Sequence, residues 1–177
     1  DFLPASGVRS LRYTHRAMDG ADLYFVANKL AKSETAVCAF RVRGMRPEIW
    51  RPDTGAIELP AIFEETDGVT RLPLSFDPSG SVFVVFRRKA AGGRVRSAAL
   101  DGREILSTMG APAIPAPGDD PGFTLNEARD GGLEVLSGRE GAISLTYADG
   151  TTGRIDVPGI AAPIEIPGPW EVRFDGG

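Results

Sequence analysis

The sequence contains very little of the two residue types on which most metal and nucleophilic sites depend. It has one cysteine, Cys38, and one histidine, His15, among 177 residues. A single thiol cannot form an internal disulfide, so a disulfide framework is excluded. The usual zinc sites combine several cysteine and histidine ligands, so they are excluded as well. Cys38 lies in the apolar run 36–42, where we expect a small core residue.

Long apolar runs are also missing. No stretch approaches the ~18 consecutive apolar residues of a membrane-spanning helix, so we predict no contact with a membrane. The net charge is −4, and without a general basic field we predict no nucleic-acid partner. The charge is uneven: residues 1–51 hold nine basic and five acidic residues (+4), and residues 101–177 hold five and thirteen (−8). We interpret this asymmetry as two surfaces of opposite sign.

Helical periodicity is almost absent, and strand-like alternation takes its place. Turn sequences such as Asp19-Gly20, Asp67-Gly68 and Asp101-Gly102 separate the runs. A repeat of about ten residues per strand and turn is typical of a β-sandwich. We therefore predict an all-β fold, an antiparallel β-sandwich of immunoglobulin-like or jelly-roll-like type, with two packed β subdomains as a further option. The predicted strands include Leu11–Arg16, Asp22–Asn28, Ala36–Val42, Glu48–Arg51, Ile57–Glu64, Thr70–Phe76, Ser81–Arg87, Val95–Leu100, Glu104–Ser107, Phe123–Ala128, Leu133–Ser137, Ala142–Ala148, Thr152–Val157 and Ile164–Phe174.

The pattern divides the chain into three parts. Residues 1–90 read as one β-sandwich, with Ser81–Arg87 as a central strand because it is nearly all apolar. Residues 91–122 combine weak strands with a linker or loop rich in proline and glycine. Residues 123–177 read as a second β block that leads towards a following domain.

The sequence offers few parts for a catalytic site. His15 is the only imidazole, and no G-x-S-x-G nucleophile turn is present. Glycosidases need two carboxylates about 5–9 Å apart across a cleft. Glu64 and Glu65 are adjacent in a predicted strand, so their side chains diverge. Asp119-Asp120 is a weak Ca²⁺ candidate, because the D-x-D-x-D-G pattern is missing. We predict no catalytic residue, no metal ligand and no cofactor in this chain.

Two tryptophans, Trp50 and Trp170, lie near predicted strand or turn edges. A planar ring can stack on the apolar face of a sugar, so both are candidates for carbohydrate contact. The alternative is that each is partly buried and structural, as tryptophan commonly is.

Several short segments occur together in the chain: Leu11–Arg16 (LRYTHR), Asp22–Asn28 (DLYFVAN), Phe40–Gly44 (FRVRG), Pro47–Gly55 (PEIWRPDTG), Leu72–Leu74, Asp77–Arg87 (DPSGSVFVVFR) and Gly168–Asp175 (GPWEVRFD). Their order and spacing resemble those of one known family, glycoside hydrolase family 106, the bacterial α-L-rhamnosidases. The resemblance is dense over residues 11–87, returns at 168–175, and departs at Thr14, where an isoleucine is expected. It implies the region after the catalytic barrel of an enzyme that removes terminal α-L-rhamnose with inversion.

The resemblance also implies where the chemistry lies. The catalytic carboxylates and a Ca²⁺ ion would belong to a barrel that precedes Asp1, and the parent enzyme would be periplasmic or extracellular. None of those residues carries over to this chain. What carries over is a structural signature that includes His15, Arg16 and Trp50, which are candidates for contact with the barrel or the edge of its cleft.

Three hypotheses follow for the function of the chain. In the first, it is a non-catalytic β-sandwich portion of a rhamnosidase-like hydrolase and supports the catalytic barrel, its partner. In the second, it is an independent carbohydrate-binding module for rhamnose-containing glycans, contacted through Trp50 or Trp170. In the third, it is an immunoglobulin-like protein-interaction domain.

Overall fold

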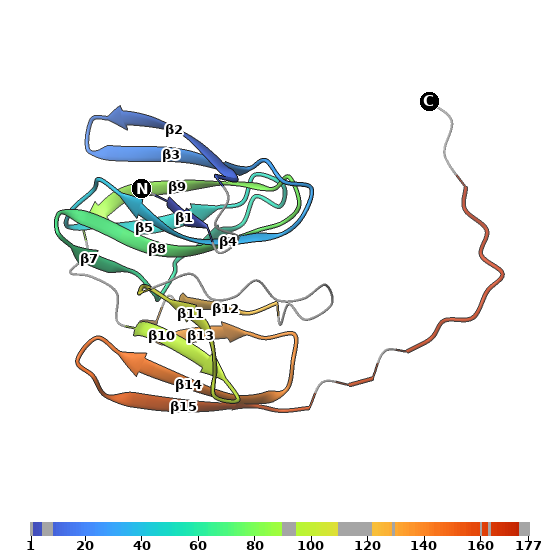
Figure 1. Ribbon diagram of the computed structural model, residues 1–177. Coiled ribbons are helices and arrows are strands. Elements are labelled where there is room, and N and C mark those ends of the chain that lie inside the picture. The colour runs from blue at the N-terminus through green and yellow to red at the C-terminus, as the bar shows by residue number, and fades with distance from the viewer. Residues whose placement is uncertain are drawn as a thin grey trace.

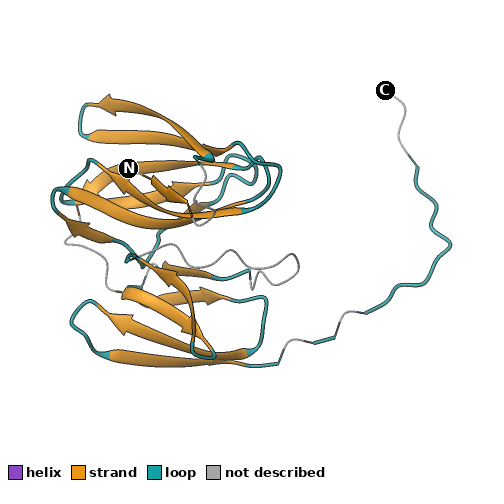
Figure 2. Cartoon of the chain, viewed as in Figure 1, coloured by secondary structure: helices purple, strands orange, loops and turns teal. Residues whose placement is uncertain are grey.

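The computed structural model describes residues 2–4, 9–89, 95–109, 122–128, 130–159, 161–162 and 164–173. These residues form strands and turns, with no helix among them (Figure 2). The predicted all-β class is therefore confirmed. All the paired strands are antiparallel, as expected for a chain without helical crossovers.

The first part of the chain forms two sheets that pack face to face (Figure 1). One sheet has the order β1-β4-β8-β7, and the other has the order β2-β3-β9-β5-β6. Their strands are β1 (Phe2–Pro4), β2 (Leu11–Met18), β3 (Ala21–Asn28), β4 (Glu34–Phe40), β5 (Met45–Trp50), β6 (Ile57–Glu58), β7 (Glu64–Thr66), β8 (Val69–Phe76) and β9 (Ser81–Lys89).

The core of this sandwich lies between the two sheets. Phe40 of β4 contacts Tyr24 of β3 and Phe86 of β9, with ring centroids 4.9 and 5.5 Å apart. Phe40 and Phe86 are fully buried, and burial of each such side chain contributes about 1.5–3 kcal/mol. The central position predicted for Ser81–Arg87 is correct, because β9 pairs with β3 on one side and β5 on the other. The β-sandwich prediction is thus confirmed.

A second β block follows in the chain, and Figure 1 shows it below the sandwich. Its main sheet has the order β11-β10-β14-β15, beside the separate pair β12-β13. The turn Asp101-Gly102 joins β10 to β11 with φ of 48° and 79°, the left-handed values that a tight primed turn requires. The strands are β10 (Val95–Leu100), β11 (Arg103–Ser107), β12 (Thr124–Glu127), β13 (Leu133–Leu136), β14 (Gly141–Tyr147) and β15 (Thr152–Val157).

The segment between β6 and β7 connects the two parts. The Ala61 amide donates to the Leu125 carbonyl at 3.0 Å, and the Glu127 amide donates to the Leu59 carbonyl at 2.7 Å. Ile62 is buried in the second core together with Val95, although it belongs to the first part of the sequence. The second core therefore includes residues from before position 90 as well as from after it.

Two predicted strands differ from the structure. The run Ile57–Glu64 was predicted as one strand, but it forms the two short strands β6 and β7 with residues 59–63 between them. Residues 59–62 leave the sandwich because they pair with the second block, whereas Phe63 is buried in the sandwich core. Period-two alternation cannot reveal this change of partner. The strand predicted over Ile164–Phe174 is also wrong, since the described residues 164–173 form no strand. Among the described residues, no neighbouring strand pairs with this segment. Alternation of apolar and polar residues does not by itself produce a strand.

Candidate functional site

His15 lies on β2, on the face that continues the sandwich core. Its ring stacks on Tyr24 with centroids 4.1 Å apart and planes 7° apart. Its Nε2 atom is 2.6 Å from Oδ1 of Asp22, and both side chains are about one-third exposed. Burial, followed by the nearby charge of Asp22, raises the pKa of Tyr24. The imidazole is thus held by a ring on one side and a carboxylate on its edge.

Arg16 lies on the opposite face of β2, as strand alternation predicts. Its side chain is exposed, and in the register of the sheet it stands beside Leu23 of β3. His15 and Arg16 therefore point to different sides of one sheet and do not form a single site.

Trp50 lies on that same outer face of the sheet and belongs to a charged cluster centred on Glu48. The indole Nε1 donates to Oε2 of Glu48 at 3.1 Å, and the guanidinium of Arg87 covers the indole ring, 5.2 Å from its centroid. Arg87 also donates to both Glu48 oxygens, at 3.0 and 3.2 Å. One face of Trp50 is therefore occupied by Arg87, which leaves less of the ring for a sugar.

Glu48 is the buried member of this cluster. Its side chain is fully buried, while those of Arg87 and Arg88 are 41% and 62% exposed. Burial acts to raise the pKa of the Glu48 carboxyl, but hydrogen bonds from Arg87 and Trp50 and the charges of both arginines outweigh it. The net result is a pKa below the ordinary value, so Glu48 is ionised at neutral pH and balanced by two cations.

Sequence reasoning selected Trp50 but missed Glu48 and Arg87. Glu48 and Trp50 are two positions apart on one strand, so they share a face, and this signal is present in the sequence. The approach of Arg87 depends on the pairing of β5 with β9, whose register shifts between Arg46 and Pro47. No local pattern reports that register.

Trp170 lies far from this cluster along the chain, in the described segment 164–173 after β15. Its side chain is 68% exposed. Glu171 and Arg173 form an ion pair at 3.2 Å within the same segment. The structure therefore does not bring the four selected residues together: His15 and Arg16 share β2, Trp50 stands three strands across the sheet, and Trp170 lies outside the sheets.

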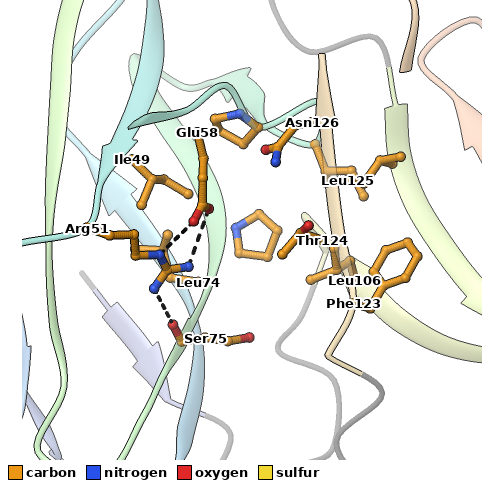
Figure 3. Close-up of a pocket in the computed structure, with 13 residues that line it drawn as sticks. Ile49, Arg51, Glu58, Leu74, Ser75, Leu106, Phe123, Thr124, Leu125 and Asn126 are labelled. Carbon is orange, nitrogen blue, oxygen red and sulfur yellow. Dashed lines mark hydrogen bonds and ion pairs between the residues drawn. The ribbon is translucent and has the colours of Figure 1, made fainter. Parts of the chain in front are cut away.

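A pocket occurs at the junction of the sandwich and the second block (Figure 3). Arg51 and Glu58 form an ion pair at 2.8 Å on its sandwich side, and Thr124 and Asn126 of β12 lie across from them. The pocket encloses about 70 Å³, whereas sites that enclose small-molecule ligands are about 300–1,000 Å³. This pocket is thus too small to enclose a sugar ring.

Among the described residues, no group of three or more histidine, cysteine, aspartate or glutamate side chains is placed to hold a metal ion. The weak candidate Asp119-Asp120 lies outside the described residues. Within the described part of the chain, no helix is long and apolar enough to cross a membrane.

Comparison with known proteins finds similarity to one family over the first part of the chain. Residues 1–63 match the family model of glycoside hydrolase family 106, α-L-rhamnosidase. A protein of Formosa agariphila, named provisionally as a β-glucuronidase, is 38% identical over 86 residues, which is 48% of this chain and 7% of that protein. The solved rhamnosidase of Novosphingobium sp. PP1Y has 32% identity and a TM-score of 0.48, covering 56% of this chain and 10% of that one.

The match of residues 1–63 to the family model confirms the resemblance to glycoside hydrolase family 106 for the N-terminal part of the chain. The chain spans 7% of the length of the curated relative and 10% of that of the solved rhamnosidase. The matched segment 1–63 contains β1 to β6, so it supplies strands to both sheets of the sandwich.

Proposed function

We propose that this chain, whose residues 1–63 carry the family 106 signature, is a non-catalytic β-sandwich portion of a rhamnosidase-like glycoside hydrolase. The observation that carries the proposal is the family match itself, which falls on strands of the sandwich. In this proposal the chain supports a catalytic barrel that belongs to the same polypeptide. The small share of the relatives' length that the chain spans is in keeping with a supporting part.

The internal contacts of the chain suit a rigid support. Backbone hydrogen bonds from Ala61 and Glu127 connect the sandwich to the second block, and the ion pair of Arg46 with Glu127 lies at the same junction. Two β units held by such contacts can transmit a fixed orientation to a neighbouring domain. We assign to Arg16 and Trp50, which share the outer face of the five-stranded sheet, the role of contacting that neighbour, and we assign the same role to His15 because it lies on the edge strand β2.

The sugar specificity of the whole enzyme is part of the proposal. The family match points to α-L-rhamnosides, whereas the Formosa agariphila relative carries the name of a β-glucuronidase. We favour α-L-rhamnosides in rhamnose-containing glycans, because the family model matches the chain directly. Such polymeric substrates place the enzyme in the periplasm or outside the cell.

The test compares the chain of 177 residues with the complete polypeptide that contains it. Both are assayed with p-nitrophenyl α-L-rhamnoside and with p-nitrophenyl β-D-glucuronide. We expect the complete polypeptide to hydrolyse the rhamnoside and the chain alone to hydrolyse neither compound. Turnover by the chain alone contradicts the supporting role, and a complete polypeptide without a catalytic domain contradicts the assignment to a hydrolase.

A second candidate function, carbohydrate binding by the chain itself, is favoured by one observation. Trp170 is 68% exposed, so its ring is open to a sugar in a way that Trp50 is not. Titration of the chain with rhamnose-containing oligosaccharides would then quench tryptophan fluorescence in a saturable manner. The quenching would disappear in Trp170→Ala and persist in Trp50→Phe. Absence of any saturable response leaves the supporting role as the better account.

A further inference from the structure

Strand β2 is unusual among the strands of the sandwich because it is almost entirely exposed. Of its eight residues, Leu11–Met18, only Leu11 is buried and the other seven are exposed. It is the outermost strand of the five-stranded sheet, and Figure 1 shows no labelled element beyond it. In an antiparallel pair, every second residue of an outermost strand directs its N–H and C=O groups away from its neighbour. Within the described residues, no strand pairs with those groups.

Such an edge is a template for pairing with another strand unless it is blocked. Proline, a β-bulge and shortness are three of the usual blocks, and β2 has none of them: it contains no proline and pairs with β3 without a register shift over eight residues. Its charged side chains, Arg12 and Arg16, oppose pairing with a basic strand but favour pairing with an acidic one. Two large apolar side chains stand exposed on it, Tyr13 at 57% and Met18 at 54%. The strand thus offers both unpaired backbone groups and apolar surface.

The charge around β2 indicates the chemistry of its partner. Residues 9–32 hold five basic residues and two acidic ones, a balance of +3 in a chain whose net charge is −4. One of the two acids, Asp22, is engaged by His15. Arg12 and Arg16 project from the outer face of β2, are exposed, and form no ion pair with any residue of the described part of the chain. A partner with carboxylates opposite these arginines would complement the strand.

We propose that β2 binds an extended acidic segment of the catalytic domain, which adds to the sheet as one further strand. Main-chain hydrogen bonds would provide the pairing, carboxylates of the segment would meet Arg12 and Arg16, and an apolar side chain would cover Tyr13. This inference rests on the proposed function, because the segment belongs to a neighbouring domain of the same polypeptide. It goes further in naming the strand, the mode of pairing and the charge of the partner.

Hydrogen exchange tests the pairing directly. The amides of β2 are followed by mass spectrometry in the chain of 177 residues and in the complete polypeptide, with β15 as the control because it is the outermost strand of the other block. We expect the outward amides of β2 to exchange about tenfold more slowly, or slower still, in the complete polypeptide, and those of β15 to be unchanged. Equal exchange of β2 in the two proteins overturns the inference. Slow exchange of β2 already in the chain alone, as two copies pairing through β2 would produce, also overturns it.

Charge reversal tests the acidic nature of the segment. Arg12→Glu together with Arg16→Glu in the complete polypeptide is compared with Arg96→Glu together with Arg103→Glu, which makes the same change of charge at exposed positions of the second block. We expect only the first pair to restore fast exchange in β2. Slow exchange that persists in the first pair excludes an acidic partner and overturns the inference. If the complete polypeptide is not a hydrolase, the proposed function fails, whereas an active hydrolase with unprotected β2 rejects this inference alone.

Discussion

Nη1 of Arg46 lies 2.7 Å from Oε2 of Glu127, and this ion pair joins the sandwich to the second β block. Both side chains are mostly buried, at 19% and 14% exposure, so water screens the pair only in part. Two further nitrogens of Arg46, Nε and Nη2, are buried without a hydrogen-bond partner. The guanidinium therefore depends on Glu127 for the compensation of its charge.

Replacing Glu127 by glutamine should destabilise the protein by about 1–3 kcal/mol, because the mostly buried guanidinium of Arg46 loses its counter-charge. Urea unfolding measures the loss. The control is Asp156→Asn, which breaks the ion pair of Arg154 with Asp156, where both side chains are about two-thirds exposed. That control should leave stability almost unchanged, because solvent screens an exposed ion pair. Equal effects of the two substitutions would show that the junction pair contributes no more than a surface pair.

Ile62→Ala should lower the free energy of unfolding by about 2–5 kcal/mol, because Ile62 is 2% exposed in the second core and its loss leaves a cavity. The substitution should also speed hydrogen exchange in β10 and β14, although Ile62 precedes both strands in sequence. Ile57→Ala serves as the control. Ile57 is 54% exposed, so its replacement should lower the free energy of unfolding by about 0.5 kcal/mol or less. An effect of Ile62→Ala confined to the sandwich would contradict the shared core.

Glu48→Gln should reduce stability at pH 7 by about 1–3 kcal/mol, because it removes the charge that Arg87 and Arg88 balance. The folded pKa of Glu48 lies below the ordinary value of 4.5, so the charged form stabilises the fold above that pH. This stabilisation is lost as the pH falls through the folded pKa. The difference between the wild-type protein and the variant, measured by urea unfolding, should therefore shrink below pH 4.5.

Glu134→Gln is the control for this pH dependence, because Glu134 is exposed on β13. Its stability should follow that of the wild-type protein at every pH. A difference between wild type and Glu48→Gln that stays the same at pH 7 and in acid would show that the carboxylate charge is not the source of the effect.

Cys38 should not react with a thiol reagent in the folded protein. Its side chain is fully buried, and burial raises the pKa of its thiol well above the ordinary value, so little thiolate is present at pH 8. Reaction with Ellman's reagent should be slow in buffer and fast in urea, with a midpoint that follows unfolding. Rapid labelling under native conditions would place Cys38 at the surface and contradict the packing of β4.

Much of the fold could be predicted locally. Asp101-Gly102 supplies the left-handed backbone of a tight turn. The run Ser81–Arg87 is nearly all apolar, and burial of its side chains favours a place in the middle of a sheet. The segments with the clearest alternation and turn chemistry became strands close to their predicted bounds. The strand predicted over Ile164–Phe174 was wrong because alternation describes the faces of a strand but not whether a neighbouring strand exists.

The candidate site divides in the same way. Trp50 and His15 could be selected from residue type and position alone, and strand alternation correctly placed Arg16 on the face opposite His15. The contact of Arg87 with Glu48, the ion pair of Arg46 with Glu127 and the place of Ile62 in the second core were beyond such reasoning. Each of them joins residues more than thirty positions apart, as in the 39 that separate Arg87 from Glu48.

The sequence by itself determined the class of the fold, the turns and the family resemblance, because these depend on residue type and on spacing over a few neighbouring positions. Only the tertiary structure decided which strands meet, that Ala61 and Ile62 leave the sandwich for the second core, and that β2 remains exposed. The reason is physical: strand register and packing are chosen by the burial of side chains and the pairing of backbone groups across the whole chain, and a local pattern fits several such arrangements equally well.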